Sequence, residues 1–263
     1  MRFSLLLILL TAKIFALGDD DLDGVNNDRD RCKNTPFSDL VDASGCSVTS
    51  LSSNHRFGIN IGLLFSELDQ DIFQEKNTLY QTYQIDYKYE DISVTISSAT
   101  YRQDDKVGMS DTYLTMSYSY DITDSIIIVP SIAFIFPTYD TGYSNEKTDV
   151  ETGLELHFTY DKYLFFGRVS YAFINDKNVG ELIYQNGSGL SLGMSRNITD
   201  RLDMSLAYNE QKSIYKYEKE IQSGALFLYY SLNENYYVTS GYSYGLSDLA
   251  SKHLLSLSIG YNF

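Results

Sequence analysis

The sequence predicts an all-β protein, namely a transmembrane antiparallel up-and-down β-barrel of about 12 strands. From residue 55 onward, apolar and polar side chains alternate with period two over segments of about ten residues, which is the length that crosses a bilayer at a tilt. Short turns also alternate with longer polar loops along this part of the chain. The composition agrees, because there are 24 Tyr and 14 Phe but only 3 Pro.

Two classes of protein are disfavoured. The formal net charge of −15 argues against nucleic-acid binding, which requires a basic surface. No segment after residue 18 reaches the roughly 18 apolar residues of a membrane helix, since the longest candidate, IIIVPSIAFIF, is short and contains Pro130. Any contact with the membrane interior must therefore be made by strands.

Residues 1–18 predict a secretory signal peptide. Arg2 provides a short basic start, the run SLLLILL is apolar, and Ala16 and Gly18 are small residues in the pattern of a signal-peptidase site. We therefore expect an oxidising compartment, where a structural disulfide is stable.

The acidic run that follows has the ligand register of a calcium loop. Oxygen ligands at alternate positions, a glycine at the sixth and a backbone carbonyl at the seventh are the EF-hand pattern, although helices are not predicted on either side. The alternative is a solvated acidic spacer without metal. The predicted ligands are Asp19, Asp21, Asp23, the carbonyl of Val25, Asn27 and Asp30, with Gly24 at the turn.

Residues 19–47 resemble a thrombospondin type 3 repeat of the kind found in OmpA-like outer-membrane proteins. The resemblance implies calcium binding and a disulfide between Cys32 and Cys46, and the segment departs from the family pattern at Asn27 and Lys33. The predicted fold is thus a barrel preceded by a small calcium and disulfide module and a polar linker, 48–54. The residues that carry the resemblance are Asp21, Asp23, Gly24, Val25, Asp30, Cys32, Thr35, Pro36, Val41, Asp42, Gly45 and Cys46.

The barrel, residues 55–263, is predicted from repeated alternation. In RFGINIGLLF, for example, Phe57, Ile59 and Ile61 share one face while Gly58 and Asn60 share the other. The predicted strands are 55–66, 78–89, 91–101, 111–121, 125–136, 148–160, 163–174, 181–196, 201–209, 220–231, 236–244 and 252–263.

The last predicted strand places Leu257, Ile259, Tyr261 and Phe263 on one face. This pattern resembles the signal by which the barrel-assembly machinery takes up bacterial outer-membrane proteins, and it implies an outer-membrane location in a Gram-negative-type bacterium. A secreted soluble β-sandwich is the alternative, and it would have to bury these apolar faces elsewhere.

The face opposite the apolar one is predicted to line the barrel interior, where carboxylates outnumber cations. Such a lumen favours cations or neutral polar solutes, unless the charged groups pair across it and seal it. The predicted lumen-lining residues are Asp86, Lys88, Tyr101, Asp121, Glu151, Glu155, His157, Arg168, Asp203 and Asn209.

The histidines do not predict catalysis. His157 is followed by Thr159 where a lipase-type arrangement would have serine, and His253 and Ser256 fall on opposite faces of a strand. We therefore expect no catalytic residue, with a membrane-embedded hydrolase as a minor alternative.

Clustered tyrosines are expected to form the aromatic girdles at the bilayer boundaries. These clusters are Tyr236, Tyr237, Tyr242 and Tyr244, and Tyr83, Tyr87 and Tyr89. The loop tyrosines Tyr139, Tyr143, Tyr215 and Tyr217 are expected to be available to an external partner.

The sequence therefore predicts a passive channel for small hydrophilic solutes, surrounded by outer-membrane lipid, with the calcium-binding module as a periplasmic cap. The competing prediction is a non-conducting structural or adhesion protein with a sealed interior.

Overall fold

The computed structural model describes residues 25, 27–33, 35, 41–46, 55–70, 73–104, 106–138, 147–175 and 183–263. The chain forms two compact units, Met1–Ser53 and Asn54–Phe263. The predicted signal peptide, 1–18, and the predicted linker, 48–54, lie outside the described residues. Among the residues that are described, no helix is long and apolar enough to span a membrane.

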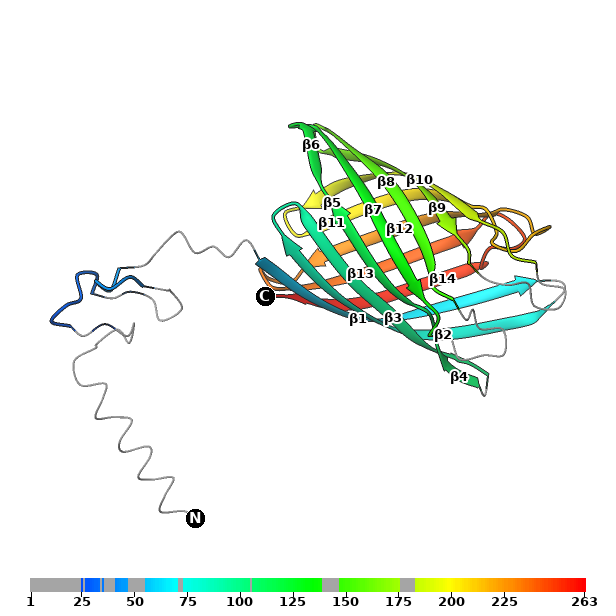
Figure 1. Cartoon of the computed structure of the whole chain (residues 1–263), viewed down its shortest axis with the longest axis horizontal. Coiled ribbons are helices and arrows are strands. Elements are labelled where there is room, and N and C mark those ends of the chain that lie inside the picture. The colour runs from blue at the N-terminus through cyan, green and yellow to red at the C-terminus, as the bar shows by residue number, and fades with distance from the viewer. Residues whose placement is uncertain are drawn as a thin grey trace, which may run out of the picture. The chain divides into compact units, whose positions relative to one another are not determined.

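The second unit is one antiparallel sheet closed on itself (Figure 1). Strands pair with their neighbours in the chain, and β1 pairs with β14 to complete the barrel. The strands are β1 (His55–Gln70), β2 (Phe73–Tyr89), β3 (Ile92–Gln103), β4 (Lys106–Met109), β5 (Thr112–Tyr118), β6 (Tyr120–Thr123), β7 (Ile126–Phe136), β8 (Asp149–Tyr160), β9 (Tyr163–Phe173), β10 (Gly187–Thr199), β11 (Leu202–Gln211), β12 (Ile221–Ser231), β13 (Tyr236–Gly245) and β14 (His253–Asn262).

Three of these labels belong to one interrupted strand. Both β4 and β5 pair with β3, and both β5 and β6 pair with β7, so the barrel has 12 spans, as predicted. Between the pairs Thr100–Met109 and Ser97–Tyr113 the β4–β5 side carries one residue more than β3. That extra residue makes a β-bulge, which sequence alternation alone did not predict.

The two ends of the barrel differ. At one end, called the short-turn end, hairpins such as β8–β9 turn through Asp161 and Lys162 only. At the other, called the long-loop end, several connections are longer, as between β7 and β8 and between β9 and β10. The chain enters β1 and leaves β14 at the short-turn end, where the Phe263 N–H donates to the Phe57 carbonyl over 2.8 Å. The unequal ends agree with the predicted up-and-down meander.

Three predicted strand boundaries were wrong. The polar stretch after residue 66 was expected to be a loop, but β1 continues to Gln70 and β2 begins at Phe73, because backbone pairing needs no apolar side chains. The strand predicted from residue 181 begins only at Gly187, because Tyr184 instead forms an isolated bridge with Tyr215 of the next long loop.

The two faces of the sheet have opposite character. One face carries large apolar side chains that are about half exposed, such as Ile61 at 53% and Leu257 at 56%. On the other face Asn60 of β1 reaches the Tyr237 hydroxyl of β13, across β14, at 3.5 Å. Side chains two strands apart meet on the concave side, so the polar face lines the interior and the apolar face suits lipid.

Candidate functional site in the barrel interior

The interior carries a charged cluster on the wall formed by β8 and β9. Glu155 and Arg168 are direct cross-strand partners, with a guanidinium nitrogen 4.0 Å from the carboxylate. Arg168 also donates to Glu151 over 3.0 Å, and the His157 ring lies 2.5 Å from Glu155. One arginine therefore contacts two carboxylates.

Gly153 leaves the room that the Arg168 guanidinium occupies. A Cβ at this position would stand 2.9 Å from a guanidinium nitrogen and 2.7 Å from the Ser131 hydroxyl. Since Ser131, Gly153 and Ser170 are consecutive cross-strand partners on β7, β8 and β9, the arginine can lie along the wall over small residues.

Asp86 organises a second polar region on β2. Its carboxylate accepts hydrogen bonds from the Gln84 amide at 2.9 and 3.0 Å and from the Thr95 hydroxyl at 2.7 Å. Lys88 lies two residues further along β2, opposite Arg56. This polar region thus contains one carboxylate among neutral hydrogen-bonding groups, with cations at the short-turn end.

The other predicted interior residues occupy the same face of their strands. Asp121 of β6 lies opposite Ile127, and Asp203 of β11 lies opposite Tyr229. Asn209 accepts a hydrogen bond from the Ser191 hydroxyl over 2.8 Å.

Sequence reasoning missed some charged residues of the interior, among them Arg56 and Asp149. Arg56 shares the face of its cross-strand partner Lys88, and Asp149 shares the face of Glu151, two residues along β8. Asp149 is 2% exposed and accepts a hydrogen bond from the Asn175 N–H over 2.7 Å. Both residues lie within the predicted strands 55–66 and 148–160, so applying the alternation to the first residues of each strand would have found them.

Inward aromatic side chains lie over glycines of neighbouring strands. Tyr237 is paired with Gly260, and a Cβ built on that glycine would overlap the tyrosine ring. The same arrangement recurs where Phe166 is paired with Gly193. Tyr101 likewise covers Gly108. These rings therefore lie along the wall of the barrel instead of pointing toward its axis.

Tyr237 was predicted to belong to an aromatic girdle, and that prediction was wrong. Tyr236 and Tyr237 are consecutive in β13, so they must face opposite sides of the sheet. Tyr236 pairs with Tyr261 on the apolar face, whereas Tyr237 lies inside. The other predicted girdle tyrosines, Tyr83, Tyr87, Tyr89, Tyr242 and Tyr244, share the face of the apolar side chains.

Two histidines lie on the outer face beside tyrosines. The His55 ring is 2.8 Å from the Tyr87 hydroxyl near the short-turn end, and the His253 ring is 2.9 Å from the Tyr242 hydroxyl near the long-loop end. These contacts place both histidines in the aromatic belts rather than in the interior.

Of the predicted external tyrosines, Tyr139 and Tyr143 lie outside the described residues. Tyr215 packs against Tyr184 with ring centroids 5.3 Å apart. Tyr217 is 82% exposed, with the Lys216 ammonium 5.3 Å from its ring centre.

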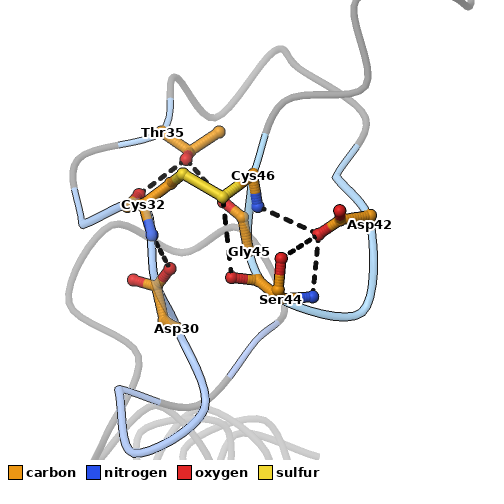
Figure 2. Close-up of a disulfide and its surroundings, with 7 residues drawn as sticks. All are labelled: Asp30, Cys32, Thr35, Asp42, Ser44, Gly45 and Cys46. Carbon is orange, nitrogen blue, oxygen red and sulfur yellow. Dashed lines mark hydrogen bonds between the residues drawn. A yellow bond between two sulfur atoms is a disulfide. The ribbon is translucent and has the colours of Figure 1, made fainter.

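The first unit contains the predicted disulfide. Cys32 and Cys46 are bonded, and the buried Thr35 hydroxyl lies 2.7 Å from the Gly45 carbonyl beside the bridge (Figure 2). Gly45 has a φ of 76°, a conformation that glycine adopts without strain.

The loop between the two cysteines is also tied by Asp42. Its carboxylate accepts hydrogen bonds from the Ser44 hydroxyl and the Ser44 N–H, at 2.6 and 2.8 Å, and from the Cys46 N–H at 3.2 Å. These bonds, the Ser44 hydroxyl first, hold the pKa of Asp42 below its ordinary value.

Only half of the predicted calcium ligands can be placed. Asp19, Asp21 and Asp23 lie outside the described residues, whereas the remaining three are described. Asp30 is 8% exposed, and one of its oxygens accepts the Cys32 N–H over 2.8 Å (Figure 2). Across the described part of the chain, no group of three or more His, Cys, Asp or Glu side chains could hold a metal. Val25, Asn27 and Asp30 thus contribute at most part of a site.

Solved membrane barrels share this fold. The chain is similar to an outer membrane channel from Pseudomonas putida F1, with a TM-score of 0.63 and 10% identity over 80% of this chain and 95% of that one. It is also similar to the NanC porin, with a TM-score of 0.57 and 12% identity over 79% and 98% of the two chains. For the KdgM porin in complex with disordered oligogalacturonate, the TM-score is 0.54 and the identity 11% over 78% and 99%.

Neither a family model nor a curated protein sequence matches the chain. At these identities the structural similarity establishes the fold, which is that of an outer-membrane β-barrel.

Proposed function

We propose that this protein is a passive outer-membrane channel for small hydrophilic solutes, with a calcium-binding module as its periplasmic cap. The observation that carries the proposal is that large interior side chains lie along the barrel wall. Rings such as Tyr237 and Phe166 cover glycines of adjacent strands, which keeps them away from the barrel axis.

The charged side chains support the same conclusion. In the described part of the interior, the ion pairs lie within β8 or join β8 to β9, and none joins opposite walls. Among the described strands, backbones also approach one another only when they are neighbours in the sheet. A sealed barrel would instead place opposite charges across its lumen.

The charge balance favours cations and neutral solutes over anions. The Arg168 guanidinium is held by Glu151 and Glu155, so it offers little positive potential to a passing anion. Asp86 adds a further carboxylate elsewhere on the wall. Fixed charge at close range sets ion selectivity in membrane channels.

The location follows from the barrel surface. Apolar side chains such as Ile61 and Leu257 suit outer-membrane lipid, and the face of β14 that carries Leu257, Ile259 and Tyr261 is the one we assign to recognition by the barrel-assembly machinery. The short-turn end then faces the periplasm, where the disulfide-bonded module would lie.

The calcium part of the proposal rests on the acidic register and on Asp30. One Asp30 oxygen is held by the Cys32 N–H, which orients the carboxylate and leaves its second oxygen for a cation. When bound, calcium would neutralise the aspartates and stiffen the loop, with Asp19, Asp21, Asp23 and Asn27 as further ligands and Val25 through its carbonyl.

The test is single-channel conductance of the refolded mature protein in a planar bilayer, first with calcium and then with chelator. Discrete steps that favour cations are expected. A folded barrel that conducts no ions would overturn the proposed channel function and point to a structural or adhesion role.

Calcium binding is tested separately by calorimetric titration of the same protein, with the Asp21→Ala and Asp23→Ala double variant as control. Saturable binding that this variant loses is expected. Equal heats from both proteins would exclude the acidic loop as the binding site.

A further inference from the structure

One strip of the interior combines an aromatic ring with uncharged polar groups. Tyr237 of β13, Gly260 of β14, Asn60 of β1 and Gln84 of β2 are consecutive cross-strand partners. Together with Asp86, which contacts Gln84, they form one continuous surface, here called the Tyr237 strip. Its chemistry differs from that of the charged wall on β8 and β9.

The aromatic part of the strip is held flat. The Tyr237 ring lies over Gly260, where a Cβ would overlap the outer atoms of the ring. Tyr229 stacks beside it, with ring centroids 5.2 Å apart and an interplanar angle of 25°. The Tyr237 side chain is partly exposed, and we infer that a sugar would contact the part of the ring that Gly260 and Tyr229 leave uncovered.

The polar part of the strip is oriented by its own hydrogen bonds. The Asn60 amide NH₂ lies 2.9 Å from the Ser258 hydroxyl, and the Gln84 NH₂ donates to both oxygens of Asp86. These contacts use the NH₂ groups of the two amides. No described residue donates to their carbonyl oxygens, which therefore remain as acceptors at the lumen surface.

We propose that the Tyr237 strip is a binding site for an uncharged saccharide that passes through the channel, an inference that rests on the proposed channel function. A sugar ring has an apolar C–H face, which stacks on an aromatic ring, and edge hydroxyls, which donate to amide and carboxylate oxygens. Tyr237 supplies the first contact, and Asn60, Gln84 and Asp86 supply the second. Apolar surface with a few placed polar groups is the usual composition of a small-molecule site.

The charges around the strip favour a neutral sugar over an acidic one. Asp86 lies within the strip, so a sugar carboxylate would meet a like charge there. Arg168 lies on the β8–β9 wall and is occupied by two carboxylates. Arg56 and Lys88 lie nearer the short-turn end and could attract an acid, so the comparison of acidic with neutral sugars tests this step directly.

The experiment records KCl currents through the refolded full-length protein in a planar bilayer while maltohexaose or hexagalacturonate is added. We expect maltohexaose to cause concentration-dependent interruptions and hexagalacturonate to cause fewer. Tyr237→Ala and Gln84→Ala should each shorten the interruptions by about tenfold, the loss expected for one strong contact. Tyr236→Ala is the matched control, because Tyr236 is the adjacent residue in β13 and faces the apolar side.

The outcomes separate this inference from the channel itself. A protein that folds but passes no KCl current overturns the proposed function. A conducting protein that maltohexaose does not interrupt overturns the saccharide site alone, and equal interruption by both sugars overturns the preference for neutral sugars. If the interruptions last as long in Tyr237→Ala and Gln84→Ala as in Tyr236→Ala, the saccharide site lies elsewhere. Heat-modifiable gel mobility serves to show that all three variants are folded.

Discussion

Replacing Arg168 should make the proposed channel more selective for cations. The guanidinium lies 3.0 Å from Glu151 and 4.0 Å from Glu155, so Arg168→Gln removes the arginine of the cluster and leaves both carboxylates in the interior. The glutamine retains hydrogen-bonding groups and fits the space over Gly153 that the guanidinium occupies. The change is therefore mainly one of charge.

The size of the effect follows from Coulomb's law. At about 7 Å in water, one unit charge contributes about 0.6 kcal/mol to the energy of a passing ion. Screening at about 0.1 M salt, where the Debye length is about 10 Å, reduces this to about 0.3 kcal/mol. Since the cation gains what the anion loses, the ratio of cation to anion permeability should rise about threefold.

The assay is the reversal potential of the reconstituted protein in a KCl gradient. Arg196→Gln is the matched control, because Arg196 donates to the Tyr163 hydroxyl on the outer face, and it should leave the ratio unchanged. Glu151→Gln should lower the ratio, since it removes a negative charge from the same cluster. Equal ratios for Arg168→Gln, Arg196→Gln and the parent, or a lower ratio for Arg168→Gln, would refute the placement of this cluster in a conducting lumen.

Three further predictions concern the wall, the module and the long loops. Gly260→Ala should reduce the conductance step by moving the covering ring into the lumen, whereas Gly224→Ala, which meets open space on the outer face, should not. Replacing both cysteines by serine should destabilise the module by about 3 kcal/mol and speed its tryptic cleavage, unless the module holds its structure without the bridge. The Asp248 carboxyl should titrate below 3.8 by NMR and return to that value in Lys219→Gln, because the Lys219 ammonium, 2.7 Å away, lowers the pKa of Asp248 through its hydrogen bond and its charge. Because the pKa of Asp248 is lower in the folded protein, the ion pair stabilises the loops fully at pH values above the ordinary pKa of Asp248. This stabilisation is lost as the pH falls through the pKa of the folded protein. An Asp248 titration midpoint that Lys219→Gln does not change would contradict the ion pair.

The fold could be predicted because each span is a local signal. Alternation in residues such as Leu257, Ile259 and Tyr261 reports a strand with one apolar face, and an even number of such strands forms a closed barrel. The disulfide could be predicted because the chain has only 2 Cys. What alternation cannot report is an irregularity such as the bulge before Tyr113, since the extra residue changes pairing without changing composition.

The partners inside the barrel depend on register, which is not a local signal. Arg168 contacts Glu151 and Glu155 because the β8–β9 turn sets which residues lie opposite one another, and one residue of slip would place Arg168 on the opposite face from the two glutamates. Tyr237 was assigned to a girdle because it lies in a cluster of tyrosines, although parity alone separates it from Tyr236. Composition was therefore the weaker guide wherever the two signals disagreed.

The bore of a 12-strand barrel depends on where its large side chains lie as well as on the number of strands. A barrel of this size lies between those that side chains fill and those that leave an aqueous channel, so a ring directed at the axis would narrow it considerably. Three of the interior rings, Tyr101, Phe166 and Tyr237, lie instead over a glycine on the adjacent strand. The glycines thus give the rings space beside the barrel wall, away from the barrel axis, where part of each ring can face the lumen. One arrangement accounts for both the open passage and the saccharide site that we propose.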